Sequence, residues 1–156
     1  MVALTASVIV AHGTDGAKNW LQGVKDNLAR KPQGNDRAQV KAIHSGLCDV
    51  AVINHYYMAK MLADPEQAPW AESVRVVFPN QEGRGTHMNV SGVALTKHSP
   101  NKEDAIKLME FLSSAKGQAL YAEQNGEYPV SNHIGTTVGF HNPLLASWGP
   151  FIQDVA

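Results

Sequence analysis

Residues 48–57 read Cys-Asp-Val-Ala-Val-Ile-Asn-His-Tyr-Tyr, the pattern of a short buried strand followed by two adjacent tyrosines. The segment Cys48–Ile53 is mostly apolar and contains β-branched residues, which is typical of a strand buried on both faces. Helical character begins at Tyr56 and continues to Ala63, where Asp64-Pro65 ends it. The stretch therefore predicts a strand joined directly to a helix, with the tyrosines at the junction.

Upstream of this stretch the sequence predicts three helices. Residues 1–12 are apolar and rich in alanine, and they end at Gly13, which suits a helix C-terminus. Residues 20–28 carry apolar side chains at every fourth position, as a second helix would. Asp36 is placed to cap a third, short helix that ends near Gly46.

Downstream, strands and helices continue to alternate. Ser73–Phe78 and Val90–Thr96 are rich in β-branched residues and are the second and third strand candidates. Residues 101–114 and 117–124 have helical patterns, the latter stopped by Asn-Gly. This alternation predicts an α/β fold with a mainly parallel sheet flanked by helices.

Composition narrows the class of protein. The chain has 156 residues, 44% of them hydrophobic and 17% charged, which is ordinary for about one globular domain. Its net charge of −1 provides no basic patch for nucleic acid or an anionic membrane. Cys48 is the single cysteine, which excludes an intrachain disulfide and a cysteine-based zinc site. The apolar run Val2–Ala11 is too short to span a bilayer and lacks signal-peptide features, so we expect neither.

Four segments, in this order and spacing, carry a resemblance to a known family: Ala29–Arg37, Asn54–Tyr57, Glu82–Gly92 and Glu127–Val130. Over nearly its whole length the chain resembles the C-terminal half of the periplasmic ferric-iron-binding proteins, the bacterial relatives of transferrin. The resemblance implies a two-lobed type II binding-protein fold with iron in the cleft between the lobes. It also implies a periplasmic receptor that passes ferric iron to a membrane ABC permease.

The same resemblance divides the chain into two portions. Residues 1–86 and 138–156 are similar to the C-terminal lobe and carry the tyrosine pair, whereas residues 87–137 are similar to part of the N-terminal lobe. Each lobe would then hold an incomplete sheet, with strand edges and apolar faces uncovered. Because such edges pair readily with another chain, we expect a homodimer.

The family's paired tyrosines correspond to Tyr56 and Tyr57 in this sequence. Ferric iron is a hard cation and phenolate is a hard anionic ligand. A free phenol has a pKa of about 10, so the metal itself must displace the proton, and binding should weaken as pH falls. Asn54 and His55 are the expected neighbours of the site.

The tyrosine pair supplies only part of the coordination shell that ferric iron requires. Two phenolates cannot complete an octahedral ferric shell, so we expect an exogenous anion or water to complete it. The Asp36-Arg37 pair resembles the branch of the family without a fixed phosphate or carbonate. The extra tyrosine and the N-terminal half of the family have no counterpart in this chain.

Two alternatives remain open from the residues. The chain could be a truncated descendant that keeps the fold but has lost useful iron binding. A small metal-dependent hydrolase is a remote alternative, because the seven histidines are scattered and none belongs to a His-Glu-x-x-His helix. We therefore expect a binding protein rather than an enzyme.

Overall fold

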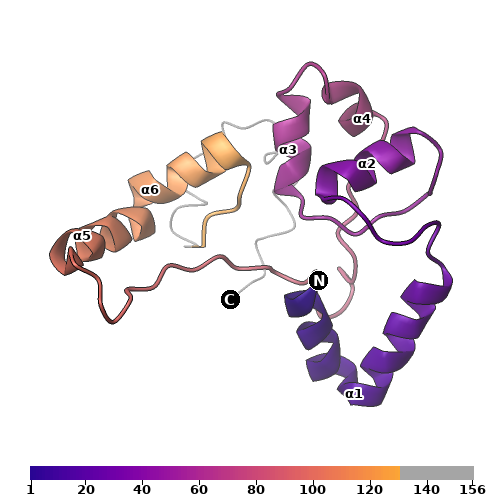
Figure 1. Ribbon diagram of the computed structural model, residues 1–156, viewed down its shortest axis with the longest axis horizontal. Coiled ribbons are helices and arrows are strands. Elements are labelled where there is room, and N and C mark those ends of the chain that lie inside the picture. Colours follow the sequence, from indigo (N-terminus) through magenta and orange to yellow (C-terminus); the bar gives the residue numbers. More distant parts are fainter. Residues whose placement is uncertain (131–156) are drawn as a thin grey trace.

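The structure is a computed structural model that describes residues 1–130, and these residues form helices joined by extended segments (Figure 1). Residues 138–156 of the first predicted portion and residues 131–137 of the second lie outside the described residues. The described helices are α1 (Val2–Asp26), α2 (Asp36–His44), α3 (Tyr56–Leu62), α4 (Ala68–Glu72), α5 (Lys102–Ser113), α6 (Ala115–Leu120) and the π-helical turn η1 (Tyr121–Asn125). Within residues 1–130 no helix is both long enough and apolar enough to cross a membrane.

The helix end predicted at Gly13 is present as a break within one longer element. Gly13 has a φ of 71° and a ψ of 174°, which breaks α1 into two arms that form a V in Figure 1. Glycine adopts positive φ without the steric cost that a side chain would add. The two helices expected on either side of this residue are therefore confirmed as two arms of one bent element.

The start of α2 differs from the prediction by one residue. Asn35, not Asp36, is the N-cap, and its side-chain oxygen accepts a hydrogen bond from the backbone N–H of Ala38 at 3.1 Å. Asparagine and aspartate are about equally good caps, so composition did not separate them. The shift leaves the Asp36 carboxylate available for contacts outside the helix.

The core lies between α2, α3 and α4. Val40, Met58, Met61 and Ala71 are buried there, and Met61 and Val40 are almost inaccessible to solvent. Side chains of this kind each contribute about 1.5–3 kcal/mol when fully buried. Tyr57 packs against the edge of this cluster, so the core fixes the orientation of the helix that carries the tyrosine pair.

The predicted parallel sheet is absent from residues 1–130. Cys48–Ile53, Ser73–Phe78 and Val90–Thr96 contain no strand, and no ladder of backbone hydrogen bonds joins them in the described residues. Val50, which was expected to be buried, is 82% exposed, and Val77 is 75% exposed. β-Branched composition favours an extended backbone. A strand also needs a neighbouring strand with which it forms backbone hydrogen bonds. These three segments do not pair with one another in this way.

The predicted helices of the C-terminal part are confirmed, with a sharp corner between α5 and α6. Ser114 caps α6, its hydroxyl accepting a hydrogen bond from the Gly117 N–H at 3.2 Å. Beyond α6, η1 ends at Gly126 with a φ of 68°, as the Asn-Gly pair predicted. In Figure 1 a long extended segment separates α5 and α6 from the core, and η1 brings the chain back to α3.

We expect Gly117→Ala to destabilise this corner. A Cβ atom at residue 117 would lie 2.2 Å from the Phe111 carbonyl oxygen and 2.9 Å from the Leu112 Cα, so the backbone must shift. Overpacking of this kind costs about 1–3 kcal/mol. Gly23→Ala in α1 is the matched control, since a Cβ there meets nothing within 4 Å. It should raise stability by about 0.5–1 kcal/mol. Urea unfolding of both variants measures the difference, and equal stability would contradict the close contact.

Candidate metal-binding site

The two tyrosines occupy the first two positions of α3 and lie side by side. Their ring centroids are 4.5 Å apart with an interplanar angle of 28°, and both side chains are half-buried. The Tyr57 ring rests on the edge of the core, whereas Tyr56 lies outside it. The predicted pair is therefore present as two stacked, solvent-accessible rings, although the strand expected before it is not.

The surroundings of Tyr56 keep its hydroxyl protonated. A hydrogen bond to Tyr57, followed by partial burial and the neighbouring charges, raises the pKa of Tyr56 to about 12. The charges that contribute include the carboxylates of Asp36 and Glu127, which disfavour a phenolate beside them. Hard oxygen groups from the two tyrosines, Asp36 and Glu127 are therefore close to one another at this site.

Asp36 joins α2 to the residues that precede α3. Its carboxylate accepts hydrogen bonds from the backbone N–H of Asn54 at 2.7 Å and from the Asn54 side-chain amide at 3.3 Å. The Asn54 side-chain oxygen in turn accepts from the Asn89 amide at 3.3 Å. The predicted neighbours Asp36 and Asn54 are thus brought together. Asn89 was missed, although it lies in one of the four segments that carried the resemblance.

Two cationic side chains flank the tyrosine rings. The Arg37 guanidinium carbon lies 5.9 Å from the centroid of the Tyr57 ring, and the Lys60 ammonium lies 5.4 Å from that of Tyr56. The Arg37 Nε is buried without a hydrogen-bond partner in the described residues. Arg37 was predicted as a neighbour of the site. Lys60 was not, but it lies four residues after Tyr56 and so on the same face of α3.

His55 lies directly before the pair and contacts a distant turn. Its Nε2 is 3.1 Å from the Gly126 carbonyl oxygen, and its ring stacks on that of Tyr128 with centroids 4.8 Å apart. Burial lowers the pKa of His55, which favours the neutral ring. Gly126, Glu127 and Tyr128 were missed as site residues. The signal that pointed to Glu127 and Tyr128 was the Glu127–Val130 segment, which Gly126 directly precedes.

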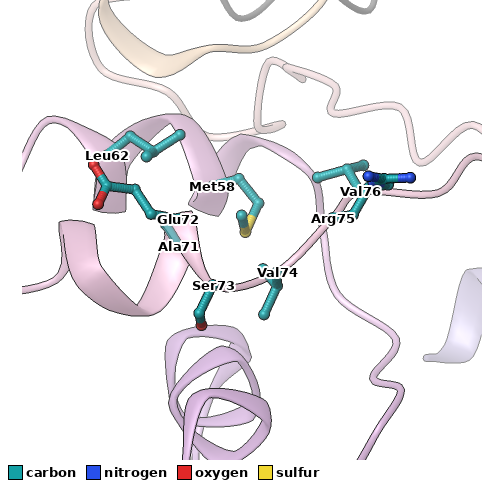
Figure 2. A pocket seen from close by; sticks show the side chains of 8 residues that line it. All are labelled: Met58, Leu62, Ala71, Glu72, Ser73, Val74, Arg75 and Val76. Carbon is teal, nitrogen blue, oxygen red and sulfur yellow. The ribbon is translucent and has the colours of Figure 1, made fainter.

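Other potential binding regions in the described residues do not include the tyrosines. No three His, Cys, Asp or Glu side chains within residues 1–130 come together in a way that could hold a metal. An open pocket of about 500 Å³ lies beside α3 and the end of α4. Figure 2 shows Met58 and Val74 facing into this pocket, and neither tyrosine lines it. The oxygen groups around Tyr56 and Tyr57 are therefore the strongest candidate for a metal.

The chain matches a known protein family over most of its length. Residues 1–147 match the family described as bacterial extracellular solute-binding protein. The chain belongs to this family. Solute-binding is the family's described role, in agreement with the expectation of a binding protein at the level of the family.

Several proteins that are similar to this chain have names that refer to iron. Iron uptake protein A1 of Synechocystis is 47% identical over 154 residues, which is 97% of this chain but 41% of that protein. The apo ferric ion-binding protein A of Pasteurella haemolytica is 51% identical with a TM-score of 0.80, over 90% of this chain and 45% of that one. The chain thus spans somewhat less than half the length of these relatives.

A third solute-binding relative has been solved with a bound metal. The Trichodesmium IdiA (FutA) protein, in complex with iron and citrate ligands, is 45% identical with a TM-score of 0.77. The match covers 85% of this chain and 42% of that one. The described helices therefore follow the backbone of ferric-binding solute-binding proteins.

Proposed function

We propose that this chain binds ferric iron through the phenolates of Tyr56 and Tyr57 and acts as a receptor, or part of a receptor, in periplasmic iron uptake. The observation that carries the proposal is the stacking of the two rings at 4.5 Å, near the carboxylates of Asp36 and Glu127. Such a cluster of hard oxygen groups suits a hard trivalent cation. A membrane ABC permease would be the recipient of the iron.

An exogenous ligand completes the coordination of iron in this proposal. Two phenolates leave the ferric shell unfilled, and the solved Trichodesmium relative holds citrate together with iron. Arg37 beside Tyr57 and Lys60 beside Tyr56 provide positive charge at the edge of the site. A carboxylate ligand such as citrate, or bicarbonate or water, is therefore the expected partner of the tyrosines.

Titration of the whole chain with ferric citrate tests this function. Phenolate bound to ferric iron absorbs visible light by charge transfer, so a coloured complex should form and saturate at one iron per site. A protein that folds but stays colourless would support the truncated descendant that has lost iron binding. Hydrolysis of model esters with added divalent metals would instead support the hydrolase.

We also propose that two copies of the chain associate. Val50, Val52 and Val77 are apolar, exposed and carried by extended segments that could pair with a second chain. Sedimentation at micromolar concentration should give the mass of two chains, and the unfolding midpoint should rise with concentration. Val77→Lys should shift the protein towards the monomer, whereas Val2→Lys at the start of α1 should not. A monomer at every concentration would contradict the association.

A further inference from the structure

His55 lies between two tyrosine rings from different parts of the chain. Its ring stacks on Tyr128 with an interplanar angle of 29° and meets Tyr56 edge-on, with centroids 6.3 Å apart and an angle of 85°. Aromatic pairs favour these offset and perpendicular arrangements. The His55 ring therefore contacts the Tyr56 ring on one side and the Tyr128 ring of the distant turn on the other.

The hydrogen bond to the turn fixes the orientation of the imidazole. A carbonyl oxygen can only accept, so the His55 Nε2 must carry the proton that it donates to Gly126. The two residues are 71 positions apart in the sequence. The contact thus joins the portion that carries the tyrosine pair to the portion that the resemblance assigned to the other lobe.

The turn itself fits tightly against α3. Gly126 has a φ of 68°, and a Cβ atom there would lie 2.5 Å from the Ala59 Cβ and 3.9 Å from the Tyr56 carbonyl oxygen. Only glycine allows this approach without a shift. The next residue, Glu127, donates its backbone N–H to the Tyr121 carbonyl oxygen at 3.3 Å, so η1 holds the turn from its other end.

We propose that His55 is a positioning residue for the iron site. Its contacts connect the turn of residues 126–128 to the first turn of α3. These contacts hold the Tyr56 ring beside Tyr57. This inference rests on the proposed function of the tyrosine pair. Without the contacts of His55, the Tyr56 ring loses its perpendicular aromatic neighbour, and Glu127 moves away from the Tyr56 ring. The Tyr56 phenolate then reaches iron only after the turn of residues 126–128 has returned to its place.

Two substitutions separate the two contacts of the histidine. His55→Gln keeps an amide N–H that can donate to Gly126 but loses the ring, whereas His55→Phe keeps a ring that can stack on Tyr128 but loses the donor. Gly126→Ala displaces the turn without changing His55. His98→Gln is the matched control, because His98 is exposed and makes none of the contacts described at the site.

The measurements are the affinity for ferric iron in competition with citrate, the charge-transfer absorbance per bound iron, and the thermal unfolding of the iron-free protein. Loss of a group that orients a metal ligand typically weakens metal binding by about 10- to 100-fold. We expect His55→Phe and Gly126→Ala to fall in this range, with absorbance per iron close to that of Tyr56→Phe. His55→Gln should lose less, and His98→Gln should behave like the parent.

A double variant distinguishes positioning from a general loss of stability. If His55 acts through Tyr56, adding His55→Phe to Tyr56→Phe should weaken binding by no more than about twofold, because coupled residues are not additive. A full additional loss in that background would overturn the inference, as would iron affinity of His55→Phe and Gly126→Ala equal to that of the parent. A parent that forms no charge-transfer band would instead overturn the proposed function.

Discussion

Replacing both tyrosines should abolish the coloured ferric complex. The charge-transfer band requires a phenolate bound to iron, and Tyr56→Phe/Tyr57→Phe removes both hydroxyls while keeping both rings. The stacked pair and its contact with the core should therefore persist, since they depend on the rings. Each single variant should keep a weaker band from the remaining phenolate. We expect the affinity for iron in competition with citrate to fall by at least about a thousandfold in the double variant, the equivalent of about 4 kcal/mol.

The control for this prediction is a tyrosine outside the pair. Tyr121 opens η1, and Tyr121→Phe should leave both the band and the affinity unchanged. Thermal unfolding of the iron-free proteins checks that the double variant still folds. Equal uptake of iron by the parent and the double variant would show that the metal binds elsewhere in the chain, and the site assignment would then be wrong.

The helices could be predicted from the sequence because local residues determine them. Gly13 marks the bend in α1, Asp64-Pro65 follows α3, and Gly126 ends η1, each through a backbone preference of its own. The cap of α2 was misplaced by one residue because Asn35 and Asp36 both suit that position. Local preferences thus locate a helix but do not choose between equivalent neighbours at its end.

The strands could not be predicted in the same way. Val50 and Val77 belong to segments whose composition favours an extended backbone, yet pairing depends on which segment lies alongside. That is a property of tertiary structure rather than of the segment. The expectation of a sheet came from alternation along the chain, and within residues 1–130 no strand is formed.

The candidate site shows the same division between local and distant information. Tyr56 and Tyr57 are adjacent in the sequence, so their proximity followed directly from it. The approach of Asp36 to Asn54 spans 18 residues and that of His55 to Gly126 spans 71, and no periodicity predicts either contact. The four segments of the resemblance contained Asp36, Asn54 and His55, and Gly126 directly precedes the fourth segment, but only the structure showed which of these residues meet.

Iron binding should become weaker by about a hundredfold for each unit that the pH falls below neutrality. The pKa of Tyr56 is raised to about 12, so its hydroxyl is protonated throughout this range and iron must displace the proton. Phenols in water, with a pKa of about 10, keep their protons in this range as a rule. Displacement of two protons gives a slope of about two in the logarithm of the binding constant against pH.

The slope can be measured by competition with a ferric chelator between pH 6 and 8, after correction for protonation of the chelator. Tyr56→Phe supplies the internal control, because one phenol then remains and the slope should fall to about one, or about tenfold per pH unit. The raised pKa of Tyr56 makes the proton harder to displace, so removing the Asp36 charge with Asp36→Asn should favour the phenolate itself. That gain competes with a weakening of the hydrogen bonds that Asn54 donates to residue 36, since an amide oxygen accepts without the charge of the carboxylate; the bond from the Asn54 backbone N–H is 2.7 Å long. A binding constant independent of pH in the parent would mean that iron displaces no phenolic proton, and neither tyrosine would then be a ligand.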